Sequence, residues 1–340
     1  MPATSNAATS NAETLMSVEN LSVTYGRGPS AMQAVRGVTF HLGRERLGIV
    51  GESGSGKSVT MMSLMGLLPS PPARIVRGAI LYQGRDVRAM SPRELRALRG
   101  GEIGFVFQDP MTSLNPVFTM GHQLMEPLRA HLGLSRKEAR TRAAELLGLV
   151  GIPAPSDRLD DYPHQFSGGM RQRVMIAMAL SCDPKVLIAD EPTTALDVTI
   201  QAQILELVRG LRARLGMGIV WITHDLALVA GIADRVMVMY AGLIVEHGPV
   251  AEIFAHPQHP YTRALLGTVP SVVGPRAKRL RTIEGQPPIL LAPPSACPFA
   301  PRCAHAFNRC RVENPRRIPV GAGHDVACWW DPATDEPRHA

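Results

Sequence analysis

Short runs of apolar residues, many of them alternating with polar ones, recur along the chain and predict β-strands. MSVENLSVTY, AVRGVTFHL and RLGIV precede the glycine-rich stretch GESGSGKS, while GEIGFVF, KVLIAD and GIVWITHD have the apolar character of buried strands. GAILYQGRDV and RVMVMYAGLIVEHG predict hairpins that turn at Gln83-Gly84 and Ala241-Gly242, and VTMMSLMGLL predicts a helix up to Pro69. This order of elements predicts an α/β fold with a mainly parallel sheet covered on both faces.

The pattern changes at three places and so predicts domain boundaries. Between Asp109 and Arg173 it is helical and methionine-rich, which predicts a helical subdomain over about 109–173. From residue 267 the composition turns to Pro, Gly and Arg, which predicts a linker and a small cysteine-bearing domain over 267–340. Residues 1–17 have no basic segment followed by an apolar one, so we expect a disordered polar tail and not a secretory signal. The main domain is predicted over 18–266.

Composition narrows the class of protein. The chain has 340 residues and 45% hydrophobic content, enough for a packed core, but no apolar run approaches the roughly 18 to 20 residues of a membrane span. The net charge is +7, yet the basic residues are scattered except at Arg276, Lys278, Arg279 and Arg281, and aromatic residues make up only 5%. Stacking on bases therefore has little support, so we expect no nucleic-acid partner and a place in the cytosol.

The stretch GESGSGKS matches the phosphate-binding pattern G-x-x-x-x-G-K-[ST], with a predicted strand before it and a helix after it. Its glycines let backbone amides turn toward phosphate oxygens, Lys57 can reach the β- and γ-phosphates, and Ser58 can bind Mg²⁺. The predicted ATP-binding residues here are Gly51, Ser53, Gly54, Ser55, Gly56, Lys57, Ser58 and Val59.

Polar side chains follow the predicted strands at the edge where ligands collect in open α/β sheets. Asp190 ends VLIAD and is expected to hold Mg²⁺ through its water shell, and Glu191 is expected to orient or deprotonate the attacking water. His224 ends GIVWITH and could donate to the γ-phosphate, while Gln108 follows GEIGFVF and could touch Mg²⁺ and water. Taken singly, each of these has a structural alternative.

Taken together, these motifs resemble the ATP-binding cassette family over about residues 18–266. The resemblance matches 51–58 to the Walker A loop, Gln108 to the Q-loop, Ser167 to Met170 to the signature, Asp190 and Glu191 to Walker B, Ala195-Leu196-Asp197 to the D-loop, and His224 to the switch histidine. It implies a P-loop cassette with an antiparallel β subdomain besides the main sheet. Tyr25 stands where the family places an aromatic that stacks on adenine, although packing alone would also explain a strand-end tyrosine.

A second glycine-paired helix start, FSGGMRQR, lies far from the first. Ser167, Gly168 and Gly169 offer a hydroxyl and open amides at a positive helix end, which is an anion site like the Walker loop. In the family, two cassettes pack head to tail, and the signature of one closes over the γ-phosphate held by the other. The resemblance therefore implies a partner ATPase subunit, which we expect to be a different chain. Phe166 and Met170 replace the leucine and glutamine commonest in the family.

Two further segments, QDPMTSLNPVFTMGHQLMEPL and HPQHPYTRALL, resemble the ATPases of oligopeptide and dipeptide importers. This branch implies ATP hydrolysis that powers peptide import, two transmembrane permease subunits, an extracytoplasmic binding protein, and a peripheral place on the cytoplasmic face of the membrane. Nickel and glutathione importers use related ATPases. The alternatives of other classes are a soluble cassette mechanoenzyme on ribosomes or DNA and a redox sensor with a vestigial nucleotide fold.

Four of the five cysteines, Cys297, Cys303, Cys310 and Cys328, form a cluster with spacing C-x5-C-x6-C-x17-C. In a reducing cytosol such clustering indicates metal before disulfides. The spacing lacks the close C-x2-C pairs of common zinc ribbons, so we favour a [4Fe–4S] cluster over Zn²⁺, with buried free thiols as the third alternative. The tail also resembles the C-terminal extension of peptide-importer ATPases.

Overall fold

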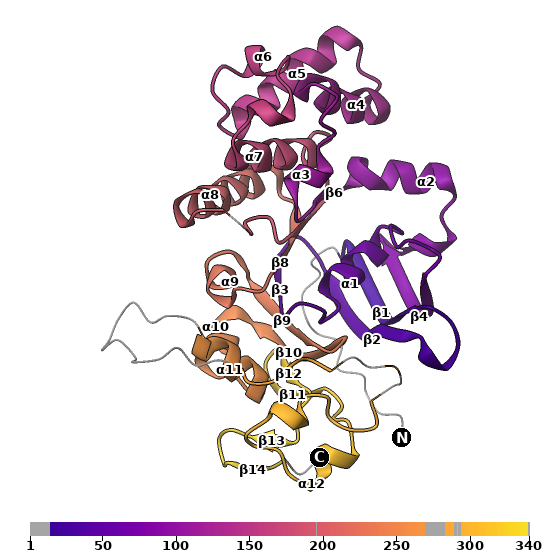
Figure 1. Cartoon of the computed structure of the whole chain (residues 1–340), viewed down its shortest axis with the longest axis vertical. Helices are drawn as coiled ribbons and strands as arrows, with labels where there is room; N and C mark the ends of the chain where they lie inside the picture. The colour runs from indigo at the N-terminus through magenta and orange to yellow at the C-terminus, as the bar shows by residue number, and fades with distance from the viewer. Residues whose placement is uncertain (1–13, 195, 269–282, 289–290, 292–293, 339–340) are drawn as a thin grey trace, which may run out of the picture.

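The computed structural model describes residues 14–194, 196–268, 283–288, 291 and 294–338 (Figure 1). The tail predicted over 1–17 is wrong at its C-terminal end, because Leu15 and Met16 are fully buried and the first strand begins at Met16. Most of that tail, and the linker from 269 to 282, lie outside the described residues. In the part of the chain that is described, no helix is long and apolar enough to span a bilayer.

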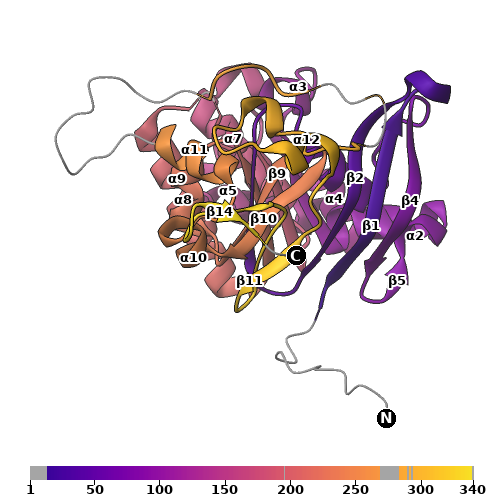
Figure 2. The ribbon, with the colours of Figure 1, turned by 90° about the horizontal axis from the view of Figure 1, so that it is seen from below.

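A twisted antiparallel sheet lies along one side of the molecule (Figure 2). Its strand order is β2-β1-β4-β5, with β1 Met16–Tyr25, β2 Met32–Leu42, β4 Ala73–Tyr82 and β5 Arg85–Asp86. The residues of β1 alternate between buried and partly exposed, as a half-buried strand requires. The predicted hairpin turn at Gln83-Gly84 is confirmed, since both residues have positive φ and Tyr82 pairs with Arg85.

The main sheet has eight strands in the order β11-β12-β10-β9-β3-β8-β7-β6. Strands β9, β3, β8, β7 and β6 are parallel, and the three at the other edge are antiparallel. Their bounds are β3 Arg46–Val50, β6 Ile103–Val106, β7 Val186–Asp190, β8 Gly218–Thr223, β9 Arg235–Tyr240, β10 Leu243–Pro249, β11 Ile318–Gly321 and β12 His324–Val326. The predicted buried strands and the hairpin at Ala241-Gly242 are confirmed.

Both faces of the main sheet are covered, because alternate residues of its strands enter different cores. In β7, Leu187 and Ala189 join the core of the helical part, whereas Val186 and Ile188 join the core shared with α1 and the antiparallel sheet. The helices over these two faces include α1 Lys57–Leu64, α8 Val198–Leu215, α9 Leu226–Ile232, α10 Val250–Ala255 and α11 Pro260–Thr268. Helix α2 Pro92–Ala97, by contrast, has no buried residue. The carboxyl ends of the parallel strands therefore lie together at one edge of the sheet, between the cores that cover its two faces.

The predicted helical region projects at the top of Figure 1 and contains α3 Pro110–Ser113, α4 Met120–Leu132, α5 Arg136–Leu149, α6 Pro155–Arg158 and α7 Gly168–Ala179. Hydroxyl caps start its longer helices: Thr119, Ser135 and Ser167 each accept a backbone N–H of the first turn. Helix α7 runs to Ala179, past the predicted limit at Arg173, and no strand interrupts 109–173, every residue of which is described.

The cysteine-bearing tail is joined to the main sheet and does not stand apart. Its strand β12 pairs with β10 through Glu246 and Val326, and through His247 and Asp325. Glu246 is fully buried, and its carboxylate accepts hydrogen bonds from His324 Nε2 at 2.8 Å and from the N–H groups of Gln258 at 2.7 Å and His259 at 3.0 Å. The tail also contains η5 Ala300–Arg302, α12 Asn308–Val312, β13 Trp330–Asp331 and β14 Glu336–Pro337.

Candidate ATP-binding and catalytic site

The phosphate loop connects the end of β3 to the start of α1, as the sequence predicts. Gly54 and Gly56 have φ of 77° and 95°, values that favour glycine. A Cβ on Gly56 would lie 2.5 Å from the carbonyl oxygen of Ala34, and one on Gly51 would lie 2.2 Å from that of Met239. The loop is thus packed so closely against β2 and β9 that side chains at positions 51 and 56 are excluded.

Lys57, at the first position of α1, is buried beneath this loop. Its ammonium donates to the carbonyl oxygens of Gly51 at 2.7 Å and Glu52 at 2.9 Å. Burial lowers the pKa of Lys57, while the nearby carboxylates of Glu191, Asp190 and Glu52 act in the opposite direction. The lysine side chain therefore reaches back across the loop and binds the carbonyl oxygens of its first two residues.

Asp190 ends β7, and its carboxylate lies near the hydroxyl of Ser58. The side chain is buried, and burial raises its pKa. Its Oδ1 has no hydrogen-bond partner among the residues that the structure describes. A buried carboxylate oxygen without a donor, next to a hydroxyl, is the oxygen donor set that Mg²⁺ prefers, so these residues fit the predicted ion.

Glu191 follows directly in a strained conformation, with φ of 45°. Three side chains from separate segments converge on its Oε2: Gln108 Nε2 at 3.1 Å, Thr194 Oγ1 at 2.9 Å and His224 Nδ1 at 3.4 Å. His224 is 59% exposed, so its ring also faces solvent. The structure thus brings together Gln108, Asp190, Glu191 and His224, which the sequence analysis predicted from three separate motifs.

Thr194 is a site residue that the sequence analysis missed. Its hydroxyl donates a hydrogen bond to the carboxylate of Glu191, three positions earlier. A hydroxyl residue so close after the Asp190-Glu191 pair was the sequence signal that could have identified it. Of the predicted D-loop residues, Ala195 lies outside the described part of the chain, and Asp197 is exposed at the start of α8.

Ser167 caps α7, and its Oγ accepts the N–H of Met170 at 3.3 Å. A Cβ on Gly169 would lie 2.9 Å from Cγ2 of Ile200 in α8, so this glycine permits close helix packing. Figure 1 shows α7 within the helical part and α1 beside the antiparallel sheet. Ser167 and the phosphate loop thus belong to different parts of the fold.

Tyr25 is the last residue of β1 and is partly buried against the core that α1 shares with the antiparallel sheet. Burial raises the pKa of its hydroxyl. This position is compatible with packing and with the stacking role that the sequence analysis expected.

The four clustered cysteines line one small cavity of about 10 Å³, together with aromatic and proline side chains. Burial raises the pKa of the Cys297 thiol to about 11 and that of Cys328 to about 12. Among the described residues, no three His, Cys, Asp or Glu side chains are arranged to hold a metal ion. Four cysteine sulfurs are suitable ligands for a metal ion or cluster, but in this structure they do not have the arrangement of metal ligands.

Comparison with known proteins identifies the family. The family models "ABC transporter" and "Oligopeptide/dipeptide transporter, C-terminal region" match residues 35–194 and 245–310. The chain is 51% identical over 318 residues to the dipeptide transport ATP-binding protein DppD of Bacillus subtilis, covering 93% of this chain and 95% of that one. It is 51% identical over 316 residues to the oligopeptide transport ATP-binding protein OppD of Bacillus subtilis, covering 93% and 88%.

Solved structures agree with this assignment. A dimeric ATP-binding cassette, MJ0796, in a post-hydrolysis state bound to ADP and Pi, matches with a TM-score of 0.62 and 28% identity, over 69% of this chain and 98% of that one. The predicted cassette fold and family are therefore confirmed. The chain belongs to the ATP-binding proteins of the ABC transporters, in their oligopeptide and dipeptide branch.

Proposed function

We propose that this chain is the ATP-hydrolysing subunit of a peptide importer and works at the cytoplasmic face of the membrane. The observation that carries the proposal is its 51% identity to a dipeptide transport ATP-binding protein over 93% of the chain. The match to the C-terminal region of oligopeptide and dipeptide transporters supports the same substrate class.

ATP would bind with its phosphates on the amides of 51–58 and its adenine against Tyr25. Lys57 would exchange its two carbonyl acceptors, Gly51 and Glu52, for the β- and γ-phosphates. Ser58, Asp190 and Gln108 would hold Mg²⁺, which would neutralise charge on the phosphate oxygens. The partnerless Oδ1 of Asp190 supports this assignment.

Glu191 would act as the general base of hydrolysis. As the water oxygen bonds to the γ-phosphorus, the bond from that phosphorus to the β–γ bridging oxygen breaks, and Glu191 accepts the proton that the water loses. ADP and phosphate are the products. Gln108 and Thr194 would fix the carboxylate, and His224 would contact the γ-phosphate; their convergence on one oxygen of Glu191 supports these roles.

A second cassette would complete each site. Ser167, Gly168, Gly169 and Met170 would contact the γ-phosphate held by the partner, and Asp197 would lie at the interface between the two. The dimeric state of the matched MJ0796 structures supports this arrangement. We propose a different ATPase chain as the partner.

The permease would contact the segment after Gln108. Large apolar side chains are exposed there, at Met111, Val117 and Phe118, and Phe107 is exposed directly before Gln108. Methionine and aromatic side chains make adaptable contacts, which suits a surface that must follow a moving membrane subunit. An extracytoplasmic binding protein would deliver peptide to the outer side of the same permease.

We further propose that Cys297, Cys303, Cys310 and Cys328 hold one [4Fe–4S] cluster, with Zn²⁺ as the alternative. Their position around one cavity supports this proposal, although binding requires the thiols to draw together and lose their protons. The tail's own cores contain few large apolar residues, so metal ligation would add folding energy there.

The experiment that tests the proposed function is affinity purification of the chain from membranes, followed by identification of the proteins that come with it. We expect a permease pair and a second ATPase in stoichiometric amounts, and peptide uptake by the complex after reconstitution. Recovery with ribosomes, or with a permease that carries nickel or glutathione and no other peptide, would contradict it.

A further inference from the structure

Glu52, the second residue of the phosphate loop, is held by three different groups. Its N–H donates to the hydroxyl of Tyr261 at 2.8 Å, and its carbonyl oxygen accepts from Lys57 Nζ at 2.9 Å. Its carboxylate forms a two-pronged ion pair with Arg302, with Nη1–Oε2 at 2.7 Å and Nη2–Oε1 at 2.9 Å. One loop residue therefore connects the phosphate lysine to an arginine of the C-terminal tail.

The side chain of Arg302 is held in place by contacts other than its ion pair with Glu52. Its side chain is only 5% exposed, Nε donates to the carbonyl oxygen of Glu284 at 2.8 Å, and Nη1 donates to the hydroxyl of Tyr240 at 3.2 Å. The guanidinium also lies over the rings of Tyr240 and Phe299. A planar guanidinium held in this way has two N–H groups already oriented to bind both oxygens of a carboxylate. The single ammonium of a flexible lysine could not bind both oxygens in this way.

The aromatic side chains around this ion pair come from the tail and from the nucleotide-binding part. Tyr240 ends β9, Tyr261 is in α11 and Phe299 is in the tail, and their ring centroids lie 4.7 to 5.4 Å apart. Arg302 is followed directly by Cys303, which lines the cysteine cavity. Movement of this part of the tail would therefore also move Glu52, because the two are joined by a packed, largely buried contact.

The charge of Glu52 makes this contact relevant to nucleotide binding. An unpaired carboxylate in the phosphate loop would repel the phosphates of ATP and would attract the Lys57 ammonium away from them. Arg302 cancels that charge and keeps the loop residue in place at the same time.

We propose that Arg302 is a positioning residue for nucleotide binding, through which the cysteine-bearing tail sets the affinity of the phosphate loop for ATP. The inference rests on the assignment of 51–58 as the ATP site. Because coupling between two sites is reciprocal, bound nucleotide must also stabilise the tail around Arg302.

The first test measures the Kd of MgADP for the purified full-length chain by calorimetry. Arg302→Ala should weaken binding on the order of tenfold, and Arg302→Lys, which keeps the charge without the two-pronged contact, should weaken it less. The double variant Arg302→Ala with Glu52→Gln should regain most of the loss, because no unpaired carboxylate remains. Arg302→Ala with the wild-type Kd, or a double variant no better than Arg302→Ala, would overturn the proposal.

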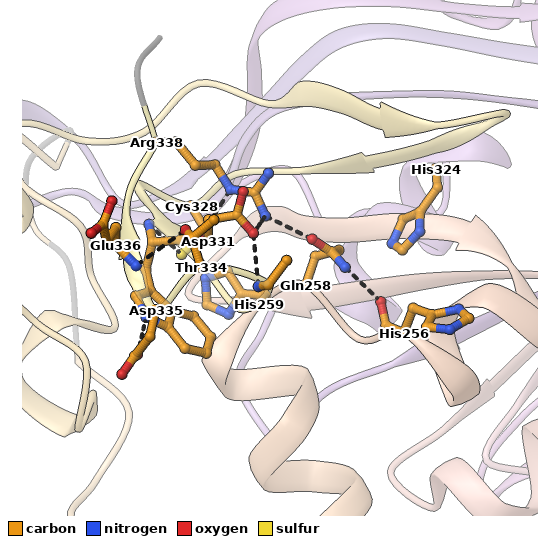
Figure 3. A network of polar contacts seen from close by, with 12 residues as sticks. His256, Gln258, His259, His324, Cys328, Asp331, Thr334, Asp335, Glu336 and Arg338 are labelled. Atoms are coloured by element: carbon orange, nitrogen blue, oxygen red, sulfur yellow. Dashed lines mark hydrogen bonds and ion pairs between the residues drawn. The ribbon is translucent and has the colours of Figure 1, made fainter.

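A matched control removes another arginine that attaches the tail. Arg338 donates to the side chain of Gln258 at 2.7 Å (Figure 3) and to the carbonyl oxygen of Trp330 at 2.9 Å. Neither acceptor belongs to the phosphate loop at 51–58. Arg338→Ala should leave the Kd of MgADP unchanged. An equal loss in Arg338→Ala would show that tail docking in general, and not the Arg302–Glu52 pair, controls the loop.

The second test measures amide hydrogen exchange with and without MgADP. Nucleotide should slow exchange over 297–303 in the wild type, and this protection should disappear in Arg302→Ala at saturating nucleotide. Equal protection in both proteins would overturn the coupling. Failure of the wild type to bind nucleotide would instead contradict the assignment of the ATP site, so the two failures are distinguishable.

Discussion

Gln108 and Glu191 lie 83 residues apart in the chain, and Gln108 Nε2 donates a 3.1 Å hydrogen bond to Glu191 Oε2. The contact forms because β6 and β7 are adjacent parallel strands, so the residues that follow them meet at the same edge of the sheet. Gln108 also begins the segment that carries the exposed apolar side chains. The bond therefore connects the carboxylate that we propose as the general base to the surface that we assign to the permease.

Replacing Glu191 with Gln should separate hydrolysis from ATP binding. The amide keeps the shape of the side chain but cannot accept the proton of water, so turnover should fall by about 10² to 10⁴ while the Kd for ATP stays near that of the wild type. Phosphate release and equilibrium binding measure the two quantities. Glu206→Gln on the exposed side of α8 is the control and should not alter either. Near-normal turnover in a folded Glu191→Gln protein would remove Glu191 from the role of base.

Ser167 should act on the ATP of the partner. In dimers of this chain with its partner ATPase, Lys57→Ala in this chain and a Ser→Arg change in the partner's signature should leave one composite site intact, and hydrolysis should persist. Placing Lys57→Ala and Ser167→Arg together in this chain, opposite a wild-type partner, should damage both sites and stop hydrolysis. The assay is ATP turnover of tagged, doubly purified mixed dimers. The reverse pattern would show that Ser167 acts on its own chain's nucleotide.

Protein purified without oxygen should be brown and contain about four irons per chain, because the four thiols would bind one [4Fe–4S] cluster. Cys303→Ser or Cys310→Ser should lose the colour, whereas Cys182→Ser, which changes the cysteine outside the cluster, should keep it. Iron analysis and absorbance spectra measure this. Colourless protein with stoichiometric zinc would contradict the iron–sulfur cluster and support Zn²⁺ as the bound metal. Metal-free protein with an ordered tail would contradict both assignments.

Glu246→Ala should destabilise the docking of the tail. The change removes a fully buried carboxylate and leaves His324 and two backbone N–H groups without their acceptor, so the free energy of unfolding should fall by about 3 to 5 kcal/mol. Glu252→Ala is the control, because its ion pair with His256 is exposed, and it should change stability by less than about 0.5 kcal/mol. Urea denaturation measures both. Equal stability of the two variants would contradict the role of Glu246.

The sequence predicts the strands and the phosphate loop well because their signals are local. A hairpin needs only apolar alternation around a turn such as Gln83-Gly84, and the loop needs only its glycines, lysine and hydroxyl. Helix α1 ends at Leu64 and not near Pro69, since Gly66 takes a positive φ just after it, and that glycine was the missed signal.

The position of the tail could not be predicted from the sequence because it depends on distant pairings. Strand β12 is three residues long, too short to show a periodic pattern. It joins the main sheet beside β10, where Asp325 contacts His247, 78 positions earlier in the chain. The pair of Arg302 and Glu52 spans 250 positions, and no local pattern connects an arginine in a Pro-rich tail to a loop near the start of the chain.

The measurement that tests the central claim most directly is ATP hydrolysis by the complex of this chain with its permease in proteoliposomes, with and without a peptide-loaded binding protein. The account predicts that the loaded binding protein stimulates hydrolysis, that peptide accumulates inside the vesicles in proportion to ATP consumed, and that Glu191→Gln abolishes both. Hydrolysis without peptide accumulation, or accumulation that persists in the Glu191→Gln complex, would contradict the claim that this chain powers peptide import.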